Sequence, residues 1–222
     1  MYKGPKCLGL TAQSSNEDKK KAAFDFVFGI GYMSFATTAV DGKTPTNRAL
    51  EIHRLDDEGN MYVGASRGKH FYDEMELFPY VSALAVDTVA VRINARLRKT
   101  DDEKLRARYW ELNRGTEALY IKDLSNFQLY LMEKGEGEVF HVFKDDGISR
   151  VRFSFGGENP RPWMYQIGDD CTGCGICVEK CQTDVISLNE SSKAVIDHFG
   201  CNECGSCYFS CPEKVIRKIE FV

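Results

Sequence analysis

The sequence lacks the long apolar stretches that membrane insertion requires. No run approaches the roughly 18 consecutive apolar residues that a bilayer-spanning helix needs. The N-terminal segment, MYKGPKCLGLTAQSSNEDKKK, also lacks the apolar stretch of a secretory signal peptide. We therefore expect a cytoplasmic protein with no membrane partner.

Signatures of nucleotide binding and an excess of basic residues are missing as well. No GxGxxG follows an expected strand, and residues 64–70 (GASRGKH) are one residue too short for a Walker loop and end in His where Ser or Thr would bind magnesium. The formal net charge is −4. Residues 166–222 contain 5 of the 29 basic and 9 of the 33 acidic side chains, so the whole net charge lies there. This charge argues against nucleic acid as a partner.

Cysteine, by contrast, is abundant and ordered. Eight of the nine cysteines fall in two runs of the form Cys-x2-Cys-x2-Cys-x3-Cys, which begin at Cys171 and Cys201. Each cysteine of the second run lies 30 positions after its counterpart, and the match extends to the pairs Gly175/Gly205, Val185/Val215 and Ile186/Ile216. The C-terminal quarter is therefore an internal repeat.

Two structural zinc sites or a disulfide scaffold would also use many cysteines, but both fit this spacing less well. Zinc sites typically use separated Cys-x2-Cys pairs rather than triple runs. A disulfide scaffold would require a secretory context. The two runs, with Pro212 after the second, resemble those of bacterial ferredoxins that carry two [4Fe–4S] clusters.

This resemblance implies a crossed pattern of ligands, in which the last cysteine of each run binds the cluster of the other run. The first cluster would be bound by Cys171, Cys174, Cys177 and Cys211, and the second by Cys201, Cys204, Cys207 and Cys181. The first run departs from the pattern at Gln182, where proline is usual. Its N–H could donate a hydrogen bond to a sulfur of the second cluster and raise the reduction potential of that cluster.

The part of the chain before the cysteine runs, up to Tyr165, has the pattern of a small β-protein. A helix is expected over 16–28, a second over 70–77, and a third after a capping box at 100–103 (TDDE). Strands rich in β-branched and aromatic residues alternate with turn signals such as Asp41-Gly42. They are expected at 32–40, 44–53, 61–65, 81–87, 89–97, 127–133, 137–143 and 149–155. Their short spacing predicts a closed or half-open barrel.

The junction between the expected strand at 61–65 and the helix at 70–77 could bind a phosphate. Ser66, Arg67 and Lys69 would place a hydroxyl and two cations beside the free amides of a helix N-terminus. Arg48, on the preceding strand, could complete the site. From the residues alone, a turn of solvated surface charges is equally expected.

The segment from Tyr32 to Val86, with the Asp41-Gly42 hairpin, Arg48, Ser66 and Lys69, resembles the FMN-binding split barrel of the pyridoxamine 5′-phosphate oxidase-like superfamily. The resemblance covers roughly residues 20–155. It implies that the matching arginine, serine and lysine hold the FMN phosphate, and that the flavin lies between the subunits of a homodimer. Residues for a pyridoxamine phosphate substrate site are not evident, so that activity is not expected.

We therefore expect a mainly β fold with flanking helices, the split barrel, over residues 1–158, a linker over 159–165, and a small α+β ferredoxin-like domain over 166–222. The expected function is an oxidoreductase in which two [4Fe–4S] clusters and FMN exchange electrons and a small organic molecule is the substrate. The partner would be a redox carrier of the ferredoxin or flavodoxin type, or a redox enzyme. One alternative is an electron-transfer subunit without its own substrate, and another is a barrel that binds haem or deazaflavin.

Four other residues could carry chemistry. His53, His70 and His141 are candidates for acid–base groups or haem ligands, but structural roles are expected because no ligand-spaced partner accompanies them. Cys7 is expected to be a free thiol near a mobile terminus.

Overall fold

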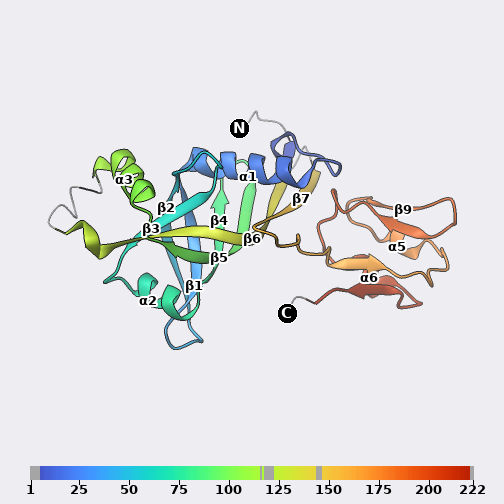
Figure 1. The fold of residues 1–222 in the computed structure, drawn as a ribbon. Coiled ribbons are helices and arrows are strands. Elements are labelled where there is room, and N and C mark those ends of the chain that lie inside the picture. The colour runs from blue at the N-terminus through green and yellow to red at the C-terminus, as the bar shows by residue number, and fades with distance from the viewer. Residues whose placement is uncertain (1–5, 116, 118–122, 144–146, 221–222) are drawn as a thin grey trace.

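The computed structural model describes residues 6–115, 117, 123–143 and 147–220. The chain forms a β-barrel, followed by a smaller domain that contains both cysteine runs (Figure 1). No described helix is long and apolar enough to cross a membrane.

Seven strands of the first part form one antiparallel sheet in the order β3-β2-β1-β4-β5-β6-β7. A further pairing of β3 with β6 closes six of them into a barrel and leaves β7 as an extension of β6. The predicted mainly β fold is thus confirmed. The strands are β1 (Tyr32–Thr38), β2 (Pro45–Arg54), β3 (Met61–Ser66), β4 (Tyr80–Val86), β5 (Ala90–Thr100), β6 (Phe127–Phe143) and β7 (Gly147–Phe155).

Strand β6 differs from the sequence expectation, which placed two strands at 127–133 and 137–143. The structure has one continuous strand of 17 residues, so the predicted break at 134–136 is wrong. A side chain at Gly135 would overlap the carbonyl oxygen of Asn94 on β5, and one at Gly137 would overlap the ring of Phe153 on β7. These glycines allow close approach within the sheet rather than a turn.

Helix α1 (Asn16–Ile30) begins where the sequence predicts it. Ser15 is its N-cap and accepts a hydrogen bond from the Asp18 N–H, while Gly31 ends it with φ of 87°. The helix buries Ala23, Phe24 and Val27, and it lies beside β7 (Figure 1).

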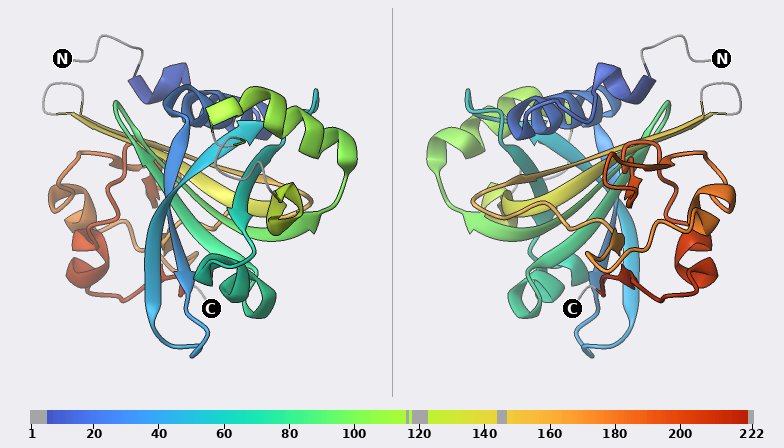
Figure 2. Two further views of the ribbon diagram at one scale, coloured as in Figure 1. Left: turned by 90° about the vertical axis from the view of Figure 1, so that its left-hand side faces the viewer. Right: turned by 90° about the vertical axis from the view of Figure 1, so that its right-hand side faces the viewer.

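Two further helices lie on the side of the barrel away from the smaller domain (Figures 1 and 2). They are α2 (His70–Leu77) and α3 (Glu103–Leu112). The predicted helix at 70–77 is confirmed. The expected capping box at 100–103 is only partly correct, because Asp102 rather than Thr100 is the N-cap of α3 and accepts from the N–H groups of Lys104 and Leu105.

Cys7, which was expected to be a free thiol, belongs to the barrel core. It lies in a short 3-10 helix, η1 (Lys6–Gly9), and its side chain is fully buried in the barrel core. Burial raises the pKa of its thiol to about 11. A buried, protonated thiol is a poor nucleophile, so Cys7 has a packing role. A second 3-10 helix, η2 (Leu124–Asn126), precedes β6.

The smaller domain shows the internal repeat in three dimensions. Its elements are β8 (Tyr165–Ile167), α5 (Ile176–Glu179), β9 (Ile186–Leu188), β10 (Ala194–Ile196), α6 (Ser206–Ser210) and β11 (Ile216–Lys218). β8 pairs with β11 and β9 with β10, both antiparallel. The core contains the repeat-related pairs Cys177/Cys207 and Ile186/Ile216, together with Tyr165 and Ala194.

Candidate functional site

The first three cysteines of the first run and the last cysteine of the second run surround one small cavity. Cys171, Cys174, Cys177 and Cys211 all line it, although Cys211 belongs to the other run. The apolar side chains of Ile167, Ala194, Val215 and Ile216 line its walls as well. Four thiols and an apolar wall are the donor set and the surroundings that an iron–sulfur cluster requires.

The remaining four cysteines also lie near one another. Burial raises the pKa of the Cys201 thiol, the hydrogen bond from the Glu203 N–H opposes this effect, and the nearby Cys181 adds to it. The pKa of the Cys207 thiol is raised to about 11, mainly by burial, and the nearby Cys201 and Cys204 also raise it. Cys181, the last cysteine of the first run, thus lies near the second run.

The backbone around both groups of thiols is turned toward sulfur. Gly175 and Gly205 adopt φ of 78° and 80° as the N-caps of α5 and α6, a conformation that glycine adopts without a Cβ penalty. The N–H groups of Val185 and Ala194 donate to the sulfurs of Cys181 and Cys171 at 3.4 and 3.5 Å. Such hydrogen bonds stabilise thiolates and tune the potential of a bound cluster.

Among the described residues, no three or more His, Cys, Asp or Glu side chains are grouped so as to hold one metal ion. A cluster of four irons and four sulfides is larger than an ion, and the thiols that bind it surround it rather than converge on one point.

The predicted phosphate site lies beside an open cleft of about 780 Å³ between β2, β3 and α2. Arg48 and Lys69 line this cleft together with apolar residues that include Val40, Leu50 and Phe71. Its volume lies within the range of about 300–1,000 Å³ that is typical of small-molecule sites. Apolar walls with two cations suit an aromatic ligand that carries a phosphate.

Arg48 already has a partner in this cleft. Its guanidinium lies 2.7 Å from the carboxylate of Glu74 on α2, whose side chain is only 3% exposed. Burial would raise the pKa of Glu74, but hydrogen bonds from Arg48 and Thr37 outweigh this effect, so the pKa lies below its ordinary value. Lys69, in contrast, is exposed at the start of α2, and its side chain has no hydrogen bond or ion pair within the described part of the chain. Sequence reasoning missed Glu74, and no local signal marks it.

Ser66 and Arg67 do not line the cleft. The Ser66 hydroxyl is nearly buried and accepts from the Gly68 N–H and from Asn126 Nδ2, both at 3.4 Å. The Arg67 side chain donates to Gln128 Oε1 at 3.1 Å. The structure therefore brings together two of the four residues that were predicted to bind the phosphate.

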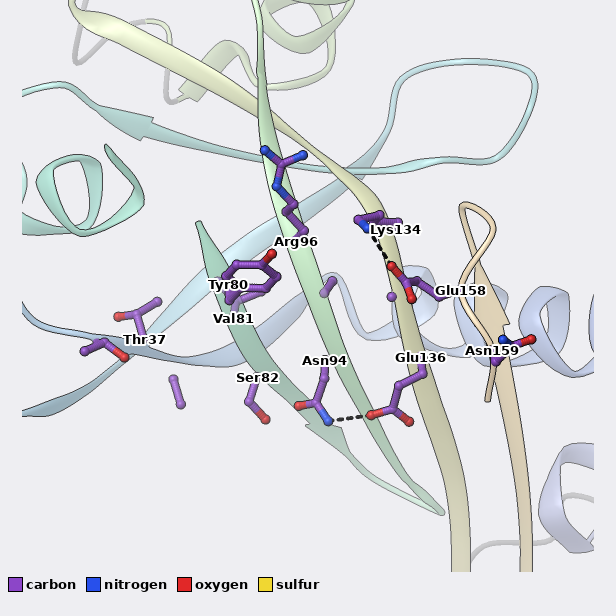
Figure 3. A pocket seen from close by; sticks show the side chains of 14 residues that line it. Thr37, Tyr80, Val81, Ser82, Asn94, Arg96, Lys134, Glu136, Glu158 and Asn159 are labelled. Atoms are coloured by element: carbon purple, nitrogen blue, oxygen red, sulfur yellow. Dashed lines mark hydrogen bonds and ion pairs between the residues drawn. The ribbon is translucent and has the colours of Figure 1, made fainter. Parts of the chain in front are cut away.

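A second pocket, of about 550 Å³, lies on the outer face of the sheet formed by β1, β4, β5 and β6 (Figure 3). Asn94 donates to Glu136 at 2.7 Å across it, and Lys134 pairs with Glu158 at 2.6 Å on its rim. Asn94 and Glu136 also line a smaller pocket of about 300 Å³ that reaches Asn202 and Glu203 of the cysteine-rich domain. The pocket on the outer face of the barrel thus adjoins a pocket at the junction of the two domains.

The histidines are placed as structural residues or on the surface. His53 packs edge-to-face on Tyr109, and burial lowers its pKa to about 4. His141 is buried, and its Nδ1 accepts from the Cys7 N–H at 3.4 Å. His70 is exposed and lines the cleft beside Lys69.

Comparisons with known proteins agree with both halves of this description. Residues 170–216 match a family model described as a 4Fe-4S dicluster domain. A NimC/NimA family protein from Clostridium acetobutylicum is similar in structure, with 22% identity and a TM-score of 0.52, over 61% of this chain and 92% of that chain. PhzG from Burkholderia lata 383, solved with tetrahydrophenazine-1-carboxylic acid, shows 13% identity and a TM-score of 0.51, over 68% of this chain and 91% of that chain. The comparison with curated proteins found no match.

At such low identities, the similarity to solved structures shows the fold alone. The iron–sulfur domain gives the chain a redox or electron-transfer role. Residues 170–216 therefore form a 4Fe-4S dicluster domain, and the barrel before it shares its fold with the NimC/NimA family protein and with PhzG.

Proposed function

We propose that this protein is an oxidoreductase that passes electrons between two [4Fe–4S] clusters and FMN, with a small organic molecule as substrate. The observation that carries this proposal is that Cys211 lines the same cavity as Cys171, Cys174 and Cys177, in a domain attached to a split barrel. One-electron centres beside a two-electron cofactor convert between the two kinds of transfer.

The crossed set of thiols would hold the clusters. Cys171, Cys174, Cys177 and Cys211 would bind one, and Cys201, Cys204, Cys207 and Cys181 the other. The two sets meet in the domain core, where Cys177 and Cys207 are both buried and α5 contacts α6. Two clusters bound in this way would lie close enough for electrons to pass between them.

The cleft between β2, β3 and α2 would hold FMN. Lys69 and Arg48 would bind the phosphate, and Val40, Leu50 and Phe71 would cover apolar parts of the cofactor. When bound, FMN supplies the two-electron exchange with the substrate. The residues of the chain bind and orient the cofactor. A charge-assisted hydrogen bond to a phosphate contributes about 1.5–3 kcal/mol.

The proposal requires a homodimer. Within one chain, α2 and the cysteine-rich domain lie on opposite sides of the barrel (Figures 1 and 2). Electrons must therefore reach a flavin in the cleft from the clusters of a second copy. The outer sheet face supports such an association, because β1 and β4 expose large apolar side chains there. They are Tyr32 (58% exposed), Tyr80 (64%), Leu84 (42%) and Val86 (61%).

The test is the cofactor content of the full chain purified without oxygen. We expect about eight irons and eight sulfides per chain, as two cubes require, with FMN released on denaturation. A visible spectrum with flavin bands above the broad absorption of iron–sulfur clusters would agree. If iron and sulfide are present and flavin is absent even after incubation with FMN, the FMN proposal is wrong. Turnover of organic substrates with an artificial electron donor would then separate an enzyme from an electron-transfer subunit.

A further inference from the structure

Four buried charged side chains join the barrel to the cysteine-rich domain. Glu138 of β6 and Arg152 of β7 are cross-strand partners, with Arg152 Nε donating to Glu138 at 3.0 Å. Arg152 also donates to Glu203 at 2.9 Å, and Arg150 pairs with the same carboxylate. All four side chains are only 6–11% exposed. Removal of one member would leave buried charge without compensation.

Glu203 is therefore the centre of the contact between the two domains. Besides both arginines, it accepts from the Met164 N–H at 3.0 Å. Burial alone would raise the pKa of Glu203, but this hydrogen bond and the two arginines outweigh burial, so the pKa lies below its ordinary value.

Aromatic stacking and a backbone hydrogen bond support the same contact. The Arg152 guanidinium lies 4.4 Å from the centre of the Trp163 ring, which in turn stacks on His198 at 5.0 Å. The Arg150 N–H donates to the Phe199 carbonyl at 2.8 Å. On the side of the cysteine-rich domain, these contacts involve residues 163–164 and 198–203, beside the start of the second cysteine run.

The internal repeat shows how Glu203 differs from its counterpart. Its counterpart in the first run is Gly173, in the same place between the first two cysteines. Both have left-handed backbone, with φ of 72° for Gly173 and 57° for Glu203. Glycine adopts this conformation freely, whereas a glutamate there is strained.

The two positions differ in what a side chain there meets. A side chain at Gly173 would overlap the Ser192 carbonyl oxygen, while that of Glu203 reaches Arg150 and Arg152 of the barrel. The Glu203 N–H also donates to the sulfur of Cys201 at 3.3 Å. One residue thus contacts both a cluster thiol and the barrel.

We propose that Glu203 is a positioning residue that holds the second cysteine run against β7 and thereby fixes the cysteine-rich domain on the barrel. The cluster of Cys201, Cys204 and Cys207 is the one beside its own barrel. This inference rests on the proposed electron transfer between the domain and the flavin.

The test is Glu203→Gly, which restores the glycine of the first run, with Asp184→Gly as the matched control. Asp184 is exposed, has φ of 54° and follows Cys181 closely in the sequence. Both variants lose one negative charge and relieve one left-handed residue near the same cluster, but only the first removes the domain contact.

We expect both variants to keep the iron and sulfide content of the parent. Glu203→Gly should raise the rate of cleavage after Glu158 by a glutamate-specific protease about tenfold or more and increase the radius measured by X-ray scattering. It should slow flavin reduction by the clusters about tenfold or more, because the cofactors are no longer held in place. Reduction of the clusters by an external carrier should keep its rate. Asp184→Gly should match the parent throughout.

If Glu203→Gly matches Asp184→Gly in cleavage, scattering and flavin reduction, the inference is wrong. If the protein contains no flavin, the proposed function fails, and cleavage and scattering still decide whether Glu203 holds the domains together. If Glu203→Gly loses its clusters, Arg152→Met replaces it, since this change breaks the same contact from the barrel side. Arg152→Met with parental cleavage and scattering would also overturn the inference.

Discussion

Arg48 on β2 and Glu74 on α2 form an ion pair of 2.7 Å that joins a strand to a helix. The glutamate is also bound by the hydroxyls of Thr37 and Thr46, at 2.6 and 3.2 Å. A residue chosen from the sequence as a phosphate ligand therefore also holds α2 on the barrel. Replacing Arg48 should therefore affect both phosphate binding and the attachment of α2 to the barrel.

Arg48→Ala should destabilise the barrel by about 3–5 kcal/mol, because Glu74 would remain charged and buried without its partner. Urea denaturation of the purified chain would measure this loss. Adding Glu74→Gln should recover much of the stability, since a neutral amide leaves no buried charge without a partner. Its oxygen can accept from one threonine hydroxyl and its NH2 group can donate to the other. A stability of Arg48→Ala equal to that of the parent would show that the ion pair contributes nothing.

Lys69→Ala should weaken FMN binding by about ten- to a hundredfold, which corresponds to the loss of one charge-assisted hydrogen bond to the phosphate. Titration of the flavin-free protein, followed by flavin fluorescence, would give the dissociation constants. Iron content and urea stability should not change, because Lys69 is exposed. Riboflavin, which has no phosphate, serves as the control ligand, and its affinity should be nearly unaffected.

The crossed ligand pattern predicts which cluster each cysteine variant damages. Cys181→Ala should disrupt the cluster bound by residues 201–207, and Cys211→Ala the cluster bound by residues 171–177. Electron paramagnetic resonance of the reduced variants, together with iron analysis, would identify the remaining cluster. Damage confined to the cluster nearest in sequence would contradict the crossed pattern.

The flavin-loaded protein should sediment as a homodimer. Mixed dimers would show whether electrons reach the flavin of the partner subunit. One chain would carry Lys69→Ala, at an FMN concentration that leaves it empty, and the other Cys201→Ala. Flavin reduction in the mixed dimer, but in neither parent dimer, is the expected result. A flavin-loaded monomer that reduces its own flavin would refute the dimer.

Stability should fall as the pH drops from about 6.5 to about 4, partly because of His53. Its pKa is lowered by burial from 6.5 to about 4, so in this range the unfolded chain binds a proton that the folded chain does not. Between pH 7 and pH 5 the loss should be about 2 kcal/mol. Urea denaturation of the parent and of His53→Gln at both pH values measures it, and equal losses in the two proteins would exclude His53 as the cause.

The cysteine-rich domain was largely predictable because its chemistry depends on short spacings. Ligands three or four positions apart, with glycines beside them, determine the local backbone almost by themselves, and a repeat in register implies two similar halves. The Asp41-Gly42 turn was predictable for the same reason. Gly42 has φ of 70°, and Asp41 accepts hydrogen bonds from the N–H groups of Lys43 and Thr44.

Contacts between distant residues were decided only by the tertiary structure. The closure of the barrel by β3 and β6, the continuity of β6 past Gly135, the pairing of Arg48 with Glu74, and the burial of Glu203 against Arg150 and Arg152 each join segments that no local pattern connects. A charged residue looks the same in the sequence whether it faces water or a buried partner. The sequence by itself determined which residues can bind a cluster, and packing determined which face of that domain meets the barrel.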